Sequence, residues 1–265
     1  MKNVRYKAIL ADLDGTVNRG AILLEGVSET YKKLDLLGIR WVFLSNNATV
    51  LDSDLCQRIQ SWGLPIDPGQ VINSASVLLN HIRNHVGGIN LMVVGQPSLV
   101  EGCFNAGAAI TEDPKKTDAV VVALDRNFTY DKMKRAHKAI QAGALFWATN
   151  LDVTFPDEES FSPGAGSVVA AIATAAGIQP QRVFGKPSPD MAEMALSRVA
   201  AARSECLVVG DRIDTDIMCA KNANMDCALV LTGATTRQMI EDGSIKPDYI
   251  IDDLSGLLEL CLQRV

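Results

Sequence analysis

The sequence contains no apolar run of the roughly 20 residues that a membrane-spanning helix needs. It also has no excess of basic residues, since 25 Lys and Arg stand against 31 Asp and Glu, for a formal net charge of −6. A polyanionic partner such as nucleic acid requires a basic face on the protein. We therefore expect neither a membrane nor a nucleic acid as a partner.

Paired cysteines are also missing, because the six cysteines are scattered and form no CxxC pair and no zinc-binding spacing. Their positions are Cys56, Cys103, Cys206, Cys219, Cys227 and Cys261. We expect buried free thiols in a reducing compartment. Because no signal peptide is visible either, we predict a cytoplasmic protein.

Histidine is scarce, with three in the chain. His81 and His85 lie four residues apart on a predicted helix, a spacing that could place both on one metal ion. The residues between them lack the Glu of a metalloprotease motif, and we interpret both histidines as solvated helix positions.

The composition is that of a globular protein, with 48% hydrophobic and 21% charged residues. A chain of 265 residues is near the length at which one hydrophobic core divides into two. We therefore expect two unequal domains.

A short apolar stretch, residues 8–11, precedes Asp12, Asp14 and Gly15. With no polar alternation, it predicts a strand buried on both faces, as in a parallel sheet covered by helices. Ligands of such sheets bind beyond the carboxyl ends of the strands. Two neighbouring carboxylates repel each other unless a cation lies beside them, and Mg²⁺ suits a site with few carboxylates and a phosphate.

The same residues could instead form a plain turn or part of a calcium loop, because Asp and Gly are common in turns. An EF-hand needs further oxygen ligands and a closing Glu, which residues 16–20 do not supply.

Two later sites follow predicted strands in a similar way. Ser45 and Asn46 follow the strand predicted over 39–44, where a hydroxyl and an amide at a helix start could bind a phosphate oxygen. A plain helix N-cap explains them equally well. Asp211 ends the apolar stretch 206–210, and we expect it to converge with Asp12 on one cation.

Lys186 follows a strand that we predict at Val183, where the chain should return to the first domain. It precedes a helix that we expect to begin at Pro189. An ammonium group there could neutralise the carboxylates and a phosphate dianion. A solvated lysine is the alternative.

Gly164 and Gly166 could suggest a dinucleotide-binding fingerprint. Val169 stands where the third glycine would be, and no apolar strand precedes Gly164. We interpret the stretch as a loop that opens a helix over 168–176.

Together these motifs resemble the haloacid dehalogenase (HAD) superfamily, in the subclass IIA branch of NagD-like and 4-nitrophenyl phosphatases. The four motifs occur in family order: DLDGT at 12–16, SNN at 45–47, GKPSP at 185–189 and GDxxxxD at 210–216. The resemblance covers essentially the whole chain. The dehalogenases themselves lack the second Asp of the first motif. Asp14, which stands at that position, therefore indicates phosphate ester hydrolysis or phosphoryl transfer.

The resemblance implies a role for each motif residue. Asp12 would attack phosphorus, and Asp14 would be the general acid and base and would bind the metal through its backbone carbonyl. Ser45, Asn46, Lys186 and Asp14 would bind the substrate. The implied metal ligands are Asp12, Asp14 and Asp211. Asp216 would contact the metal through water or hold Lys186.

The resemblance also implies a doubly wound, mainly parallel, Rossmann-like α/β core with an inserted α/β cap of the C2 type. We expect the discontinuous core at residues 1–87 and 181–265 and the cap at 88–180, where it would set specificity. Asn150 and Asp152 lie in a stretch of the predicted cap that looks like those of this branch.

The sequence therefore predicts a Mg²⁺-dependent phosphatase that hydrolyses a small phosphomonoester through a phospho-Asp12 intermediate. A phosphotransferase or mutase with the same site, and a degenerate non-catalytic binding module, are the alternatives. A receiver domain also combines acids with Thr and Lys, but it is far shorter. The expected partner is a small phosphorylated metabolite, and a homodimer is left open.

Overall fold

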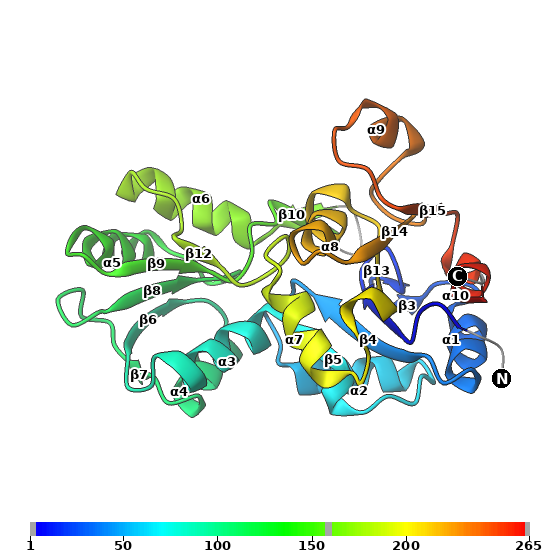
Figure 1. Ribbon diagram of the computed structural model, residues 1–265. Helices are drawn as coiled ribbons and strands as arrows, with labels where there is room; N and C mark the ends of the chain where they lie inside the picture. The colour runs from blue at the N-terminus through cyan, green and yellow to red at the C-terminus, as the bar shows by residue number, and fades with distance from the viewer. Residues whose placement is uncertain (1–3, 157–160, 263–265) are drawn as a thin grey trace. The chain divides into compact units, whose positions relative to one another are not determined.

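The computed structural model describes residues 4–156 and 161–262, and within them the chain forms two compact units (Figure 1). The first unit comprises the described parts of Met1–Ser45, Leu55–Ile72 and Lys186–Val265. The second comprises the described parts of Asn46–Asp54 and Asn73–Gly185. No helix among these described residues is both long and apolar enough to cross a membrane.

The first unit is built on a six-stranded sheet with the order β15-β14-β13-β1-β4-β5. Its strands are β1 (Ala8–Asp12), β4 (Arg40–Ser45), β5 (Val71–Asn73), β13 (Cys206–Gly210), β14 (Asp226–Val230) and β15 (Tyr249–Ile251). The pairings of β1 with β4 and β13, and of β14 with β13 and β15, are all parallel. Residues 8–11 of β1 have no exposed surface, as expected of a strand covered on both faces.

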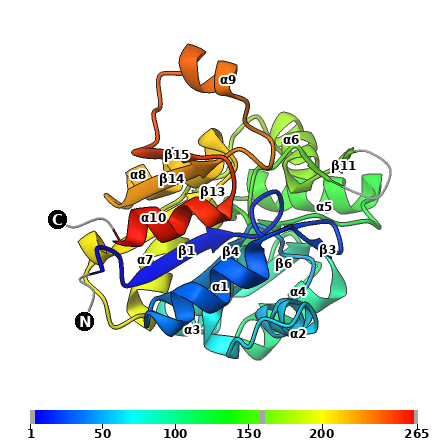
Figure 2. The ribbon, with the colours of Figure 1, turned by 90° about the vertical axis from the view of Figure 1, so that its right-hand side faces the viewer.

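Helices and short connections surround this sheet. The helices are α1 (Val27–Leu36), α2 (Asp52–Ser61), α7 (Asp190–Arg198), α8 (Met218–Asn222), α9 (Arg237–Asp242) and α10 (Leu257–Leu262). Figure 2 shows α1 and α10 side by side on one face of the sheet. A short hairpin, β2 (Asn18–Arg19) and β3 (Ile22–Leu23), follows β1. Single helical turns lie at Pro68–Gln70, Arg203–Glu205, Ile213–Ile217 and Leu254–Gly256.

The second unit has its own five-stranded sheet with the order β12-β9-β8-β6-β7. Its strands are β6 (Asn90–Val94), β7 (Ala109–Ile110), β8 (Ala119–Val122), β9 (Leu145–Ala148) and β12 (Arg182–Val183), and its pairings are parallel. The helices of this unit are α3 (Ser74–His85), α4 (Pro97–Asn105), α5 (Tyr130–Gln141) and α6 (Ala165–Ala176). In Figure 1, α5 and α6 lie along one face of this sheet and α3 and α4 along the other.

The predicted α/β fold with parallel central sheets is confirmed. The placement of β12 differs from the prediction, because this strand pairs with β9 in the second sheet. The first unit resumes at Lys186, whereas the sequence placed the second segment of the core at 181–265. That the second unit acts as a cap that sets specificity stays a prediction.

Helix α6 begins at Ala165, three residues before the predicted start, so Gly166 lies in its first turn. A Cβ on Gly164 would lie 2.2 Å from the Asp152 carbonyl oxygen, and one on Gly166 would lie 2.3 Å from the Leu151 carbonyl oxygen. The Gly166 N–H donates to the Asp152 carbonyl at 2.9 Å. The glycines thus allow close backbone packing at the helix start. A short antiparallel hairpin, β10 (Thr154–Pro156) and β11 (Phe161–Pro163), precedes α6 and was not predicted.

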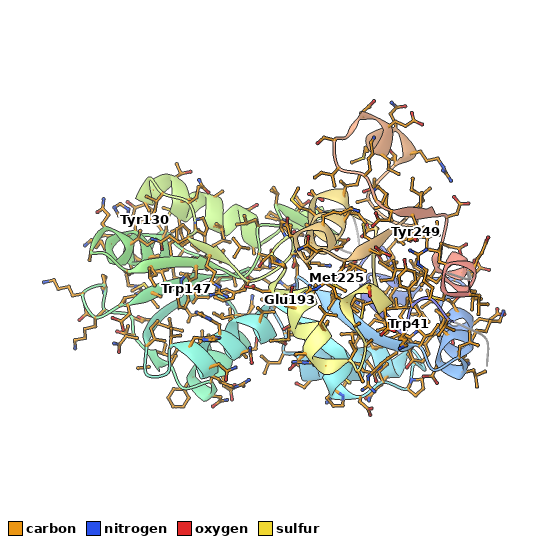
Figure 3. The ribbon with its side chains drawn as sticks, viewed as in Figure 1. Trp41, Tyr130, Trp147, Glu193, Met225 and Tyr249 are labelled. Carbon is orange, nitrogen blue, oxygen red and sulfur yellow. The ribbon has the colours of Figure 1, made fainter. Side chains whose placement is uncertain are left out.

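His81 is not the solvated position that the sequence predicted. Its ring packs against Trp147, with a centroid separation of 5.4 Å, and against Phe184 at 5.5 Å; Trp147 is labelled in Figure 3. His85 is exposed, as predicted, and its ring centroid lies 5.1 Å from that of His81. The helical spacing was correct, but the sequence did not indicate which aromatic rings would cover His81.

Candidate active site

The candidate site lies at the carboxyl ends of adjacent strands of the first sheet. Asp12 ends β1 and is aligned with Leu44 of β4, so Ser45 lies one residue further along the neighbouring strand. On the other side, Ala11 is aligned with Val209 of β13, and Asp211 follows that strand. The parallel register therefore places three motif residues at one edge of the sheet.

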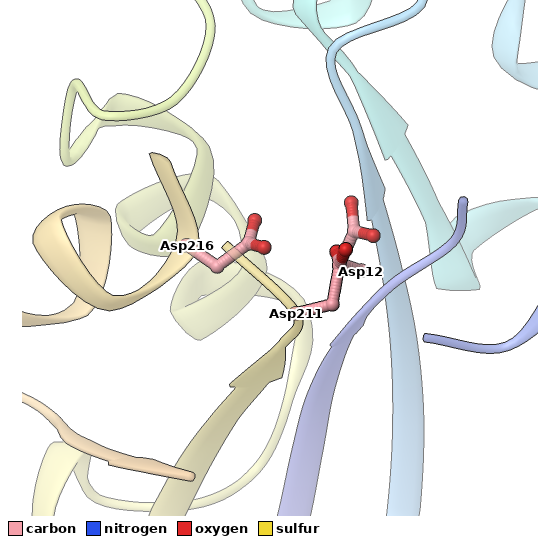
Figure 4. A group of neighbouring side chains, drawn as sticks. All are labelled: Asp12, Asp211 and Asp216. Atoms are coloured by element: carbon pink, nitrogen blue, oxygen red, sulfur yellow. The ribbon is translucent and has the colours of Figure 1, made fainter. Parts of the chain in front are cut away.

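Three carboxylates meet at this edge. Asp12, Asp211 and Asp216 each offer an oxygen, and these oxygens lie within 4.8 Å of one another. Figure 4 shows the three side chains directed toward a common region. Asp211 and Asp216 are 2% and 1% exposed, so the surrounding water does little to screen their mutual repulsion.

Lys186 is the cation that holds this cluster together. Its ammonium group forms ion pairs with Asp12 and with Asp216 Oδ1, the latter at 2.6 Å, and the residue is only 3% exposed. Burial alone would lower the pKa of Lys186, but the two carboxylates outweigh burial and raise it. Because Lys186 is buried and paired with two carboxylates, the solvated-lysine alternative is wrong.

One ammonium cannot neutralise three carboxylates. Burial raises the pKa of Asp12, and the ion pair with Lys186 only partly offsets this effect. Burial, together with the charge of Asp216, also raises the pKa of Asp211 to about 6. Asp211 Oδ1 is buried and finds no hydrogen-bond partner within the described part of the chain. An unpaired buried carboxylate oxygen is costly, and this donor set fits a hard divalent cation.

Asp216 lies in the helical turn Ile213–Ile217 that follows β13. Besides its ion pair with Lys186, it accepts a hydrogen bond from the Arg212 N–H at 3.0 Å through Oδ2. This ion pair agrees with the role in which Asp216 holds Lys186, and a contact of Asp216 with the metal through water stays a prediction.

Asp14 is exposed and is not part of the carboxylate cluster. Its Oδ1 accepts a hydrogen bond at 2.7 Å from Nδ2 of Asn18, which is itself buried and also donates to the Gly20 carbonyl at 2.9 Å. This hairpin residue orients the Asp14 carboxylate, and the sequence prediction did not include it.

Ser45 and Asn46 belong to different units, although they are neighbours in the chain. Ser45 ends β4 and is 4% exposed. Asn46 Nδ2 donates to Asp152 Oδ2 at 3.0 Å, and the Asn46 carbonyl accepts from Asn150 Nδ2 and Ser74 Oγ at 2.8 and 2.7 Å. Asn46 is thus held within the second unit, and its predicted role in substrate binding stays a prediction.

Gly210 allows Asp216 to pack against the end of β13. A Cβ at this position would lie 2.3 Å from the Asp216 Cβ, Cγ and Oδ2 atoms. The connection after β13 therefore needs glycine at position 210. The GD motif includes this glycine, but the sequence alone did not show why it is required.

We expect Gly210→Ala to lower the free energy of unfolding by about 1–3 kcal/mol, because the added methyl must displace Asp216 or the strand. Activity should fall as well, since Asp216 holds Lys186. Thermal unfolding and phosphatase assays test this expectation. Gly87→Ala is the matched control, because no atom of the described residues lies within 4 Å of its added Cβ. Equal stability of the two variants would contradict the packing argument.

Two family models match the chain. A model of haloacid dehalogenase-like hydrolases matches residues 9–109, and a second model of HAD-like hydrolases matches residues 183–257. The chain is also 34% identical over 257 residues to the sugar-phosphatase AraL of Bacillus subtilis (strain 168). This match covers 97% of this chain and 94% of that relative.

Solved structures with this fold include two other phosphatases. The 4-nitrophenylphosphatase from Thermotoga maritima matches with a TM-score of 0.91 and 29% identity over 98% of both chains. A glycerol phosphate phosphatase from Mycobacterium tuberculosis in complex with magnesium matches with a TM-score of 0.88 and 32% identity, over 96% of this chain and 76% of that chain.

The parallel sheet, its carboxylate cluster and these matches define the class: the chain belongs to the haloacid dehalogenase superfamily of hydrolases. Within that superfamily it falls in the NagD-like, 4-nitrophenyl phosphatase branch. It is a phosphatase of small phosphomonoesters, and the alternative of a non-catalytic binding module is not favoured by its relatives.

Proposed function

We propose that this phosphatase is Mg²⁺-dependent and works through a phosphoryl group carried transiently on Asp12. The observation that carries the proposal is the cluster of three carboxylates around the Lys186 ammonium, in which Asp211 Oδ1 is buried and has no partner in residues 4–156 and 161–262. Asp12, Asp211 and the backbone carbonyl of Asp14 would hold the ion. When bound, Mg²⁺ would neutralise charge on the transferring phosphoryl oxygens.

In the first step a carboxylate oxygen of Asp12 forms a bond to phosphorus while the ester P–O bond breaks. Asp14 gives its proton to the departing oxygen, so the alcohol leaves neutral. Lys186 faces the same region and stabilises the negative charge of the phosphoryl oxygens, and Ser45 hydrogen-bonds one of them.

In the second step a water molecule attacks the phosphorus of the phospho-aspartate. Asp14, now ionised, takes the water proton, and the bond between Asp12 and phosphorus breaks. The products are inorganic phosphate and a regenerated Asp12 carboxylate, so atoms and charge balance over the two steps.

Sugar phosphates, glycerol phosphate and nucleotides are the proposed substrate classes. Relatives named sugar phosphatase and glycerol phosphate phosphatase support the first two. Residues 88–180 would form the specificity-setting cap. A cytoplasmic location is proposed from the six cysteines, which are all buried and form no disulfide bond among the described residues. Release of phosphate without an acceptor distinguishes this function from phosphoryl transfer to a second substrate.

Removal of divalent metal is expected to lower the hydrolysis of 4-nitrophenyl phosphate by at least about 100-fold, because several kcal/mol of charge stabilisation are lost. Activity should return when Mg²⁺ is added to the chelated enzyme. Circular dichroism before and after chelation controls for unfolding. Full activity of the metal-free enzyme would overturn the proposed metal dependence.

A further inference from the structure

The four-residue loop that follows β14, Thr232 to Thr235, contacts Asp211 from outside the known motifs. The Ala234 N–H donates to Asp211 Oδ2 at 2.6 Å, and the Thr235 N–H donates to the Asp211 carbonyl at 3.2 Å. This 232–235 loop therefore gives one carboxylate oxygen of Asp211 a hydrogen bond, while the other, Oδ1, is buried and has no hydrogen-bond partner among the described residues.

Two glycines enclose the same carboxylate. A Cβ on Gly233 would lie 1.9 Å from Asp211 Oδ2, and a Cβ on Gly15 would lie 2.5 Å from that oxygen. Gly15 also has a φ of +95°, which side chains other than glycine rarely adopt. The backbone thus closes on Asp211 from the turn after β1 and from the 232–235 loop, and little rotation of the carboxylate is possible.

The loop is fastened to the Asp12–Gly15 turn through side chains. Thr232 Oγ1 donates to the Gly15 carbonyl at 2.6 Å, and Arg19 Nη2 donates to the Thr232 carbonyl at 2.8 Å. The first bond connects the segment that carries Asp12 to the segment that fixes Asp211. It therefore helps to set the separation between these two carboxylates.

We propose that the 232–235 loop is the positioning element for the metal-binding pair Asp12 and Asp211, with Thr232 as its key side chain. Thr232 acts through the Gly15 carbonyl, and the loop backbone acts through Asp211. Their effect passes through Asp211, whose free oxygen they aim at the space shared with Asp12. The inference rests on the proposed function, since it assigns the loop to the affinity for Mg²⁺.

The test is the dissociation constant of Mg²⁺ for the substrate-free, full-length protein, measured from the rise of the unfolding temperature with Mg²⁺ concentration. Thr232→Val removes the hydroxyl with little change in shape, and we expect Mg²⁺ to bind about three- to tenfold more weakly, as loss of one hydrogen bond predicts. Thr232→Ser keeps the hydroxyl, so its dissociation constant for Mg²⁺ should stay within about twofold of the wild-type value.

Thr236→Val is the matched control. Thr236 is close in the chain and caps α9 by accepting from the Met239 N–H at 3.3 Å, so its loss should lower stability without changing Mg²⁺ binding. Should Thr232→Val fail to fold, Arg19→Met loosens the same loop from an exposed position and should weaken Mg²⁺ binding about twofold.

Unchanged Mg²⁺ binding in folded Thr232→Val, or in Arg19→Met when that variant replaces it, would overturn the positioning role and leave the proposed metal site intact. Equal weakening in Thr232→Val and Thr236→Val would also overturn it, because the effect would then be one of general stability. Failure of the wild type to bind Mg²⁺ would overturn the proposed metal site and this inference together.

Discussion

Lys186→Met should lower turnover about 100- to 1000-fold, the range observed when one charge-stabilising donor is removed from an active site. The side chain is 3% exposed and pairs with both Asp12 and Asp216, so no other group among the described residues is seen to replace its charge. Because methionine fills a similar volume, the loss of turnover would come from the missing charge and not from altered packing. Arginine should rescue activity poorly, because its planar group does not substitute for a compact ammonium.

The same substitution should also affect stability. Removal of one partner of a buried ion pair leaves uncompensated charge and typically costs 3–5 kcal/mol. Here it would leave three neighbouring carboxylates unopposed, so we expect a clear fall of the unfolding temperature that Mg²⁺ partly reverses.

Lys221→Met is the control for Lys186→Met. Lys221 also pairs with an aspartate, Asp248, at 2.7 Å, but both side chains are more than a third exposed. A surface pair contributes about 0–1 kcal/mol, so activity and stability should change little. Wild-type turnover in Lys186→Met would show that the lysine has no role in the chemistry.

Asp12→Asn should be the most damaging substitution, with turnover reduced roughly 10⁴-fold or more, as for other enzymes that lose their nucleophile. An amide is a poor nucleophile, and it is also a weaker metal ligand than a carboxylate. The fold should persist, because the substitution conserves shape, relieves repulsion from Asp211 and Asp216, and leaves Lys186 paired with Asp216. Steady-state assays with 4-nitrophenyl phosphate, together with thermal unfolding, measure both effects.

The control for Asp12→Asn is Asp252→Asn. Asp252 is an exposed residue of the same unit that pairs with Arg237 at 2.6 Å. Its substitution should leave the activity unchanged. An Asp12→Asn variant that retains more than a few per cent of wild-type turnover would exclude Asp12 as the nucleophile.

Much of the site could be predicted from the sequence, because each strand that supplies it is a short apolar run with a polar residue at its end. Residues 8–11 and 206–210 are such runs, and a parallel sheet brings their carboxyl ends to one edge whatever the length of chain between them. The prediction that Asp12 and Asp211 converge needed nothing further.

Other features depend on tertiary contacts that no local pattern contains. The strand Arg182–Val183 is only two residues long, so its sequence does not indicate which of the two sheets it joins. Its pairing with β9 places it in the second sheet. The role of Thr232 was missed for a similar reason, since it depends on a hydrogen bond to the distant Gly15 carbonyl. A threonine and a glycine after a strand otherwise predict only a turn.

The central claim is that the phosphoryl group passes through Asp12, and trapping of the phosphoenzyme tests it most directly. Asp14→Asn would remove the proposed general acid and base; with 4-nitrophenyl phosphate, whose leaving group needs no proton, dephosphorylation should become rate-limiting and the intermediate should accumulate. Acid quenching of this variant during turnover, followed by peptide mass spectrometry, should find a hydroxylamine-labile phosphoryl group on the peptide that contains Asp12. The double variant Asp12→Asn/Asp14→Asn should lack it. If the Asp14→Asn enzyme turns over substrate and no phosphorylated peptide is found, the covalent mechanism is contradicted, and Asp12 would act through the metal alone.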